Sequence, residues 1–291
     1  MEYEDIKVHR KELDESRSID DNNGGSLLRV LTYKLTCDSS YWQERLDAIM
    51  KIIRDTGTDV ACLHGITEDW WKRIKTACGK YFVPFQIFVE EGNKTGTVLM
   101  CNSRTTRIAE GTQPYYYDFP GSEGRVIGVE IELMRSRIKD TLHIVTTELD
   151  WADEEQRASE ANIISQVVGH LKNYILVGEF PIDGYQEETN HILNRLDAMD
   201  QWRKLGCPQK LKYTSKRATV NNEQDNASNA SNASDSADED EGSRKVAEPK
   251  YLRSARVYSR ATAGSLCLVG LGQTSDTVTV RPSEYYGLLA T

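Results

Sequence analysis

The sequence predicts a layered domain of the α/β or α+β class. Short apolar runs, several of them alternating apolar and polar residues with period two, are typical of strands, and amphipathic helical segments lie between them. Antiparallel hairpins mixed with helical crossovers favour sheets covered by helices. The length of 291 residues and a hydrophobic content of 38% suit one core, so we expect a single domain over residues 26–291.

Helices are predicted where apolar residues recur at 3.6-residue spacing. Gly57 and Gly79 end the first two of these segments, and Thr67 is placed to cap the second. The four predicted helices cover residues 42–56, 67–79, 153–172 and 187–204.

Strands are predicted from two patterns. Near-continuous apolar runs such as DVACLH indicate buried strands, whereas RVIGVEIEL and LHIVTTEL alternate as half-buried strands do. The predicted strands cover residues 28–35, 59–64, 85–89, 96–101, 125–133, 142–149, 173–180, 254–259, 265–272 and 286–291.

Two segments have compositions typical of disorder. Residues 1–25 are charged and end in Asn-Asn-Gly-Gly, and residues from about 220 to 249 contain NASNASNASDSADEDEG. Neither offers enough apolar surface to offset the entropy of ordering. Ser236, three residues before Glu239, fits a phosphorylation site in an acidic run, with a solvated loop as the plain alternative.

Charge and composition exclude several classes. The net charge is −9, which argues against a generally basic nucleic-acid-binding surface but leaves room for a local groove. There is no apolar run long enough to span a membrane and no secretory signal, so we expect a nuclear or cytoplasmic protein that is not secreted. The six cysteines have no zinc-site spacing, which favours reduced, buried thiols.

Six strand ends, read in order, form a recognisable series. They are LTYKL, DVACLHGI, TTEL, VGEFP, RSARVYS and PSEYYGLLAT. This series resembles the endonuclease/exonuclease/phosphatase superfamily, most closely its tyrosyl-DNA phosphodiesterase 2 family, where the strands end as T-W-N, L-Q-E-V, S-H-L, G-D-x-N, R-x-D-R and S-D-H-x-G. The resemblance implies a four-layer sandwich, with two mixed β-sheets packed face to face and helices outside. It also implies Mg²⁺-dependent phosphodiester hydrolysis at the converging strand ends.

The same alignment places altered residues at every position where the family carries catalysis. The metal-binding glutamate falls on Gly65, the two histidines on Glu148 and Tyr285, and the asparagine of T-W-N on Lys34. Gly65 has no side chain to coordinate metal, and an ammonium group repels a divalent cation. The full set of degenerate positions is Lys34, Gly65, Glu148, Glu179, Pro181, Ala255, Glu284 and Tyr285.

Three hypotheses follow. The first, which we favour, is a catalytically inactive pseudoenzyme that acts as a binding or regulatory protein with no cofactor; its partner would be a protein or a nucleic-acid end. The second is a divergent phosphodiesterase acting on 5′-phosphotyrosyl DNA or RNA ends in DNA repair, with Mg²⁺ or Mn²⁺ held by Glu148, Glu179 and Glu284. The third is a nucleic-acid-binding module that keeps the groove without the chemistry.

The first hypothesis makes a geometric prediction. We expect Lys34 to pair with one or more of Glu148, Glu179 and Glu284, because buried charges require partners. Arg125 aligns with a family arginine near the DNA-binding surface, so it is a candidate for substrate binding or a plain surface arginine. The dipeptide at 213–214, Tyr-Thr, also fits a family position, with a solvated charged loop as the alternative.

Overall fold

The computed structural model describes twelve stretches of the chain. The predicted disordered segments, residues 1–25 and 220–249, lie outside these stretches, as do Tyr213, Glu284 and Tyr285. The described residues are 28–35, 41–78, 81–87, 95–122, 124–134, 141–182, 187–209, 212, 214–217, 250–260, 266–269 and 287–291.

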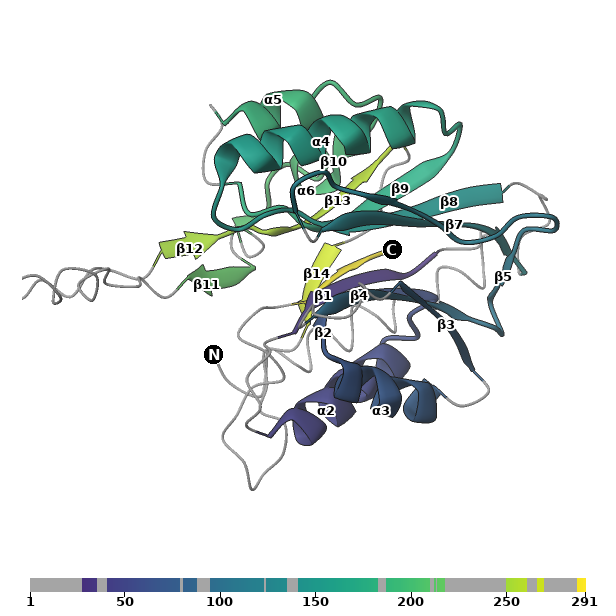
Figure 1. The fold of residues 1–291 in the computed structure, drawn as a ribbon. Coiled ribbons are helices and arrows are strands. Elements are labelled where there is room, and N and C mark those ends of the chain that lie inside the picture. Colours follow the sequence, from purple (N-terminus) through teal and green to yellow (C-terminus); the bar gives the residue numbers. More distant parts are fainter. Residues whose placement is uncertain are drawn as a thin grey trace, which may run out of the picture.

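The first sheet has six strands, with parallel pairing between β1 and β2 and antiparallel pairing elsewhere. It combines the N-terminal part of the chain with the C-terminal strand, which lies beside β1 (Figure 1). In spatial order the strands are β14 (Leu266–Val269), β15 (Gly287–Ala290), β1 (Val30–Lys34), β2 (Val60–Ile66), β4 (Gly96–Asn102) and β3 (Phe82–Ile87).

The second sheet has seven strands and contains the other parallel pair, β8 with β9. In spatial order its strands are β10 (Met199–Asp200), β13 (Ala255–Ser259), β9 (Tyr174–Glu179), β8 (Thr141–Glu148), β7 (Arg125–Leu133) and β5 (Thr106–Ile108), and β6 (Tyr115–Asp118) pairs with β7 as well. A separate two-stranded ribbon consists of β11 (Ser215–Arg217) and β12 (Lys250–Leu252).

Helices cover the outer face of each sheet (Figure 1). On the six-stranded sheet lie α2 (Trp42–Asp55) and α3 (Glu68–Cys78); on the seven-stranded sheet lie α4 (Glu154–Gly169) and α5 (Glu188–Leu193). The short helix α6 (Gln201–Lys204) contacts β13, and its Trp202 packs into the apolar cluster between the sheets. Three apolar clusters fill the spaces between the layers, one under each helical layer and one between the sheets. The predicted four-layer sandwich is therefore confirmed. None of the described helices has the length and apolar character needed to cross a membrane.

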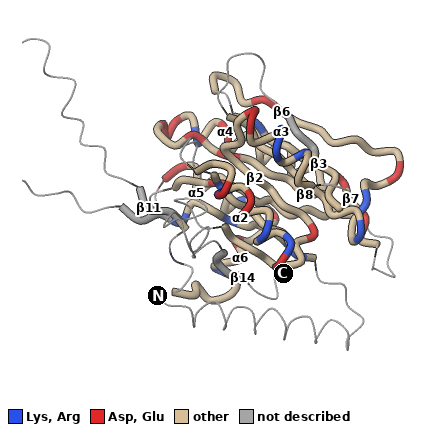
Figure 2. Tube along the Cα trace, turned by 90° about the horizontal axis from the view of Figure 1, so that it is seen from below, with Lys and Arg blue, Asp and Glu red and all other residues tan. Residues whose placement is uncertain are grey.

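Local sequence explains where the main helices lie. The apolar face of α2, with Leu46, Ile49 and Ile53, is fully buried against the sheet. The Asp153 carboxylate caps α4 by accepting hydrogen bonds from two backbone amides at 2.9 and 3.2 Å, and the Thr67 hydroxyl caps α3 as predicted. Acidic and basic residues are interspersed along the solvent faces of α2 and α3, where they form ion pairs (Figure 2).

The single helix predicted over 187–204 is wrong. The chain forms the short helix α5, turns after Asn194, enters β10 and then begins α6. The physical reason is Asp200, whose buried carboxylate caps α6 through the amide of Trp202 at 3.1 Å and pairs with Arg253 of the neighbouring segment. This tertiary ion pair overrides the helical spacing of the sequence. The strand predicted at 85–89 also begins three residues earlier, at Phe82, and the short strands β5, β6, β10, β11 and β12 were not predicted.

Candidate functional site

The degenerate positions that the structure describes lie where strands of the two sheets end together. Lys34 ends β1, Glu148 ends β8 and Glu179 ends β9. Glu148 and Glu179 are direct partners across the parallel β8–β9 pair, and Ala255 is the partner of Glu179 on its other side. Strand direction and register therefore place these positions at one edge of the sandwich.

Lys34 is held between a carboxylate and an aromatic ring. Its ammonium group pairs with Oε1 of Glu148 and lies 3.9 Å from the centre of the Trp151 ring. The indole Nε1–H of Trp151 donates to the same Glu148 oxygen at 2.9 Å. The side chains of Lys34 and Glu148 are only 14% and 25% exposed. The predicted pairing of Lys34 with a pocket glutamate is therefore confirmed.

Opposing influences set the charge of Glu148. Burial raises the pKa of this carboxyl, but the Lys34 charge, His64 and the hydrogen bonds from Lys34 and Trp151 outweigh it. The pKa of Glu148 consequently lies below its ordinary value. Glu148 is thus an ionised carboxylate at neutral pH.

Glu179 is a buried acid of a different kind. It is 1% exposed, and neither carboxyl oxygen meets hydrogen-bond geometry with another described residue. Burial raises the pKa of Glu179 to about 8; the Ser254 hydroxyl and the Lys34 charge lower it only in part, and Glu148 raises it further. Glu179 is therefore predominantly in its protonated, neutral form at pH 7.

Gly65 does more than lack a side chain. Its φ is +73°, and the β2–β4 register shifts between Leu63 and Ile66, which marks a bulge. A Cβ atom here would lie 2.6 Å from the carbonyl oxygen of Leu35. The backbone at the position of the family's metal-binding glutamate is thus one that only glycine adopts without strain.

His64 lies beneath these residues and was not predicted to belong to the site. It is fully buried between the sheets, and its Nε2 lies 3.3 Å from the hydroxyls of Thr32 and Thr146. Its Nδ1 lies 3.3 Å from the Thr97 hydroxyl. Burial is the largest influence and lowers the pKa of His64 to about 4. The imidazole is therefore neutral and links the two sheets through hydroxyl groups.

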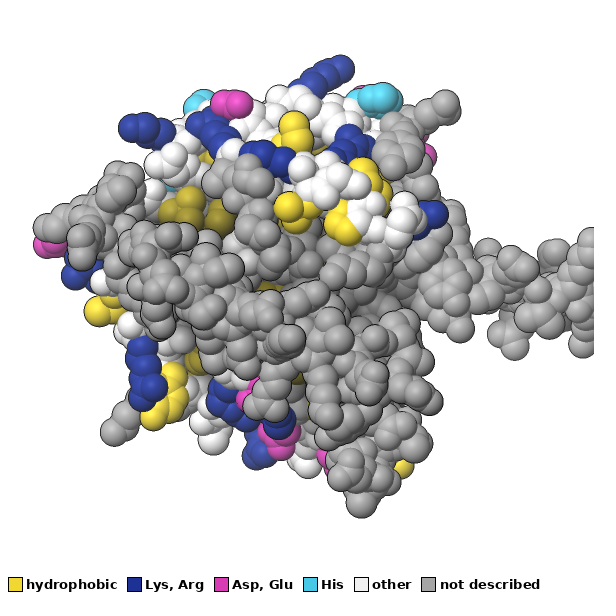
Figure 3. Space-filling model, turned by 180° about the vertical axis from the view of Figure 1, so that it is seen from behind, with side chains coloured by type: hydrophobic (Ala, Val, Ile, Leu, Met, Phe, Trp, Pro, Cys, Tyr) yellow, Lys and Arg dark blue, Asp and Glu magenta, His cyan; other side chains and the backbone are white. Residues whose placement is uncertain are grey.

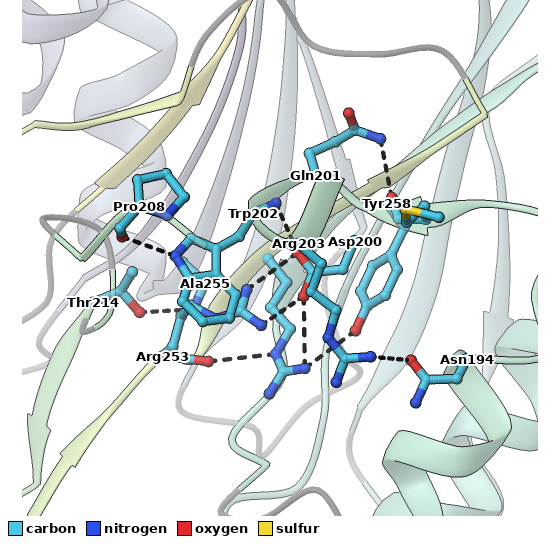
Figure 4. A network of polar contacts seen from close by, with 12 residues as sticks. Asn194, Asp200, Gln201, Trp202, Arg203, Pro208, Thr214, Arg253, Ala255 and Tyr258 are labelled. Carbon is cyan, nitrogen blue, oxygen red and sulfur yellow. Dashed lines mark hydrogen bonds and ion pairs between the residues drawn. The ribbon is translucent and has the colours of Figure 1, made fainter. Parts of the chain in front are cut away.

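The R-x-D-R position retains its two arginines around the substituted Ala255. Figure 4 shows the Arg253 guanidinium directed at Asp200 with both nitrogens, at 3.2 and 2.5 Å, and Arg256 lies 3.9 Å from the same carboxylate. The amide of Ala255 donates to the Thr214 hydroxyl at 2.9 Å. These groups bind one another and fix β13 against α6. Pro181 is buried directly after the Glu179–Phe180 segment.

Arg125 already has partners. Its guanidinium pairs with Asp118 at 2.9 Å and lies 5.3 Å from the centre of the Tyr116 ring. The Arg125 side chain is 14% exposed. Arg125 and Asp118 are also register partners across the β6–β7 pair, so the arginine fastens the end of this hairpin.

The described residues do not fit the divalent metal that the fold family implies. No three His, Cys, Asp or Glu side chains of the described stretches gather closely enough to hold a metal ion. An ammonium group occupies one oxygen of Glu148, Glu179 is protonated, and Gly65 offers no donor. A hard cation needs several ionised or carbonyl oxygens directed at one point. Glu284 and Tyr285, the remaining two degenerate positions, are beyond the described stretches.

Comparison with solved structures shows a shared fold. D. rerio TDP2 complexed with a single-strand DNA product superposes with a TM-score of 0.71, covering 90% of this chain and 97% of that one at 13% identity. Truncated Caenorhabditis elegans TDP2 gives 0.66 with 90% and 96% coverage at 12% identity. An endonuclease/exonuclease/phosphatase protein from Bacteroides vulgatus gives 0.64 with 90% and 97% coverage at 11% identity. The chain has the endonuclease/exonuclease/phosphatase fold. No family model and no curated protein matches the sequence.

Sequence reasoning located the site but missed two of its members. His64 precedes Gly65 within an otherwise apolar run, and a polar ring in a fully buried strand was the available signal. Trp151 follows the TTEL strand end by two residues, and only the three-dimensional turn brings it over Lys34. Of the three glutamates expected to surround Lys34, the structure places Glu148 in contact with it and Glu179 on the adjacent strand.

Proposed function

We propose that this protein is a pseudoenzyme of the endonuclease/exonuclease/phosphatase fold and works by binding. One observation carries the proposal: the Lys34 ammonium is paired with Glu148 at the strand ends where the fold's hydrolases are expected to place a metal. The lysine supplies a positive charge that cannot act as a Lewis acid or activate water. With Glu179 and His64 neutral, the charges of these four side chains sum to zero.

The geometry of Gly65 supports the same proposal. A lost ligand can often be replaced by a neighbouring carboxylate, but here the bulge brings the Leu35 carbonyl to within 2.6 Å of where a Cβ would lie. The backbone itself is therefore unsuited to presenting a side chain at this position. Hydrolysis would need a metal site assembled from other residues.

The experiment is hydrolysis of a 5′-phosphotyrosyl oligonucleotide in millimolar Mg²⁺ or Mn²⁺, with an active tyrosyl-DNA phosphodiesterase 2 run in parallel. Glu179→Ala serves as the matched control, because any metal-dependent turnover by this chain should require that carboxyl. We expect no turnover, or a trace that is equal in both proteins. Turnover that disappears in Glu179→Ala would overturn the proposal and establish the divergent phosphodiesterase.

Metal binding is tested separately from turnover. A ligand at ten times its Kd stabilises the folded state by about 1.4 kcal/mol, which a thermal melt detects. We expect the melting temperature to be the same in millimolar Mg²⁺ and in chelator. A rise that is specific to Mg²⁺ and is abolished in Glu179→Ala would show that the carboxyls still form a metal site.

A further inference from the structure

A basic surface lies on the α5–α6 side of the seven-stranded sheet, away from Lys34 and Glu148. Figure 3 shows Lys and Arg side chains gathered over the upper part of the face opposite to that of Figure 1, the half of the molecule that contains α5 and α6. We define the basic surface by its five cations, of which two are half-buried and three exposed: Lys172, Arg195, Arg203, Lys204 and Arg260.

Hydrogen bonds hold these residues together although they are distant in sequence. Lys204 donates to the carbonyl of Arg260 at 3.0 Å, and Arg260 in turn donates to the carbonyls of Lys172 and Asp197. Arg203 donates to the Asn194 side chain at 2.9 Å. The side chains of Arg203, Lys204 and Arg260 are therefore held in place by the fold.

The basic surface carries an excess of positive charge. Within the described residues, the carboxylate of Asp197 pairs with Arg260 at 2.9 Å, and the Asp197 side chain is 85% exposed. Five cations and this one carboxylate sum to +4. On a chain whose net charge is −9, such an excess is local and attracts an anionic partner.

The chain itself contains an anionic segment of opposite charge. Residues 221–242 contain seven carboxylates and no Lys or Arg. They belong to the connection between Arg217 and Lys250, the outer ends of the β11–β12 ribbon, and this connection is outside the described stretches.

The inner end of the β11–β12 ribbon, whose outer end carries that connection, lies beside α6. Arg253 directly follows β12, and it pairs with Asp200 and lies 4.4 Å from the ring centre of Trp202, a residue of α6 (Figure 4). Half of the connection, roughly fifteen residues, spans up to about 50 Å when extended, which exceeds what is needed to reach α6. Tethering also gives the segment a local concentration of about millimolar.

We propose that the acidic segment 221–242 docks in cis on the basic surface formed by Lys172, Arg195, Arg203, Lys204 and Arg260. The interaction is electrostatic, so salt weakens it. It covers lysines that would otherwise be accessible to solvent and to other polyanions. This inference does not depend on the proposed function, because none of its residues contacts Lys34 or Glu148.

The test is lysine reactivity, read residue by residue by mass spectrometry after brief acetylation. The full chain is compared with a variant in which the seven carboxylates of 221–242 are changed to amides, which keeps length and composition close. If the segment is docked four-fifths of the time, Lys172 and Lys204 react about fivefold faster in the amide variant. Lys51, exposed on α2 in the opposite helical layer, is the internal control and reacts equally in both proteins.

Three outcomes decide the matter. Faster labelling of Lys172 and Lys204 in the amide variant, reproduced in the full chain by high salt or by Arg195→Gln with Arg203→Gln, supports docking. Equal labelling of both lysines in the two proteins at low salt overturns it. Protection that disappears on dilution shows that the segment binds another copy of the chain, which overturns docking in cis.

Discussion

Replacing Lys34 by methionine tests whether the Lys34–Glu148 pair is the structural centre of the degenerate site. Methionine keeps most of the apolar stem and removes the ammonium, so Glu148 loses its cation while the Trp151 hydrogen bond remains. Removing one partner of a buried pair costs about 3–5 kcal/mol, whereas an exposed pair contributes at most about 1 kcal/mol. The pair is partly shielded, at 14% and 25% exposure, so we expect a loss of about 2–3 kcal/mol at pH 7.

The effect of pH follows from the shift of Glu148. In the native protein its pKa is below the ordinary value, so its stabilisation is present above the unfolded pKa and is lost as pH falls through the folded pKa. Without Lys34, burial dominates and the pKa of Glu148 rises above the ordinary value. The carboxyl then takes up a proton as pH is lowered, and the difference between the two proteins becomes smaller at pH 5 than at pH 7.

The assay is urea unfolding at pH 7 and pH 5, followed by tryptophan fluorescence. Glu148→Gln and the double variant complete a double-mutant cycle. The sum of the two single losses in free energy of unfolding should exceed the loss in the double variant. A change below about 0.5 kcal/mol at pH 7, the usual range for exposed surface substitutions, would show that the contact contributes nothing. A double variant whose loss equals the sum of the two single losses would refute the pairing argument.

Three further predictions concern the residues around this pair. Gly65→Ala should lower the free energy of unfolding by about 2–4 kcal/mol, because the new Cβ combines a positive φ with a contact of 2.6 Å to the Leu35 carbonyl oxygen. Gly111→Ala has a φ of +78° but open space around the Cβ, so it should cost only about 1 kcal/mol, and equal losses in urea unfolding would refute the steric part of the argument. The pKa of His64 is about 4 in the folded state against 6.5 in the unfolded state, so the free energy of unfolding should decrease by on the order of 3 kcal/mol as pH falls from 6.5 to 4. His64→Gln should reduce this pH dependence, which unfolding measured at several pH values would show. The pKa of Glu179 is raised to about 8, so the free energy of unfolding should decrease as pH rises from 4.5 to 8. Glu179→Gln should be at least as stable as the native protein at pH 7. A Gln variant that is less stable at pH 7 would show that the native carboxyl is ionised.

The layered architecture could be predicted because it depends on the buried apolar residues of the strands, which are different residues from those that carry catalysis in the family. DVACLHGI and NYILVGEF remain buried strands whatever polar residue follows them, so the order of strand ends survives the loss of the active-site residues. The contact of Lys34 with Glu148 was predicted from the resemblance, because the alignment places both residues at pocket positions of the family, and the structure confirms the contact.

What sequence reasoning missed depends on tertiary contacts. The break in the helix predicted over 187–204 comes from Asp200, which pairs with Arg253, a residue fifty-three positions away. The positive φ of Gly65 comes from a bulge that packs against Leu35. The local sequence around Asp200 and Gly65 contains no information about Arg253 or Leu35. Neither the helix break nor the bulge could therefore be predicted from the local sequence.

The changes at the site reinforce one another, and this decides what a simple reversion can do. Changing Lys34 to asparagine would remove the ammonium but would supply no new carboxylate, and Glu179 would remain protonated because burial is the largest cause of its raised pKa. Changing Gly65 to glutamate would require the bulge to refold first, since the added Cβ meets the Leu35 carbonyl. Binding a divalent ion here would therefore require three changes together: removal of the Lys34 ammonium, loss of the Glu179 proton, and a different backbone conformation at Gly65. A Lys34→Asn, Gly65→Glu double variant should accordingly show no Mg²⁺-dependent rise in melting temperature, and such a rise would place the barrier in the side chains alone.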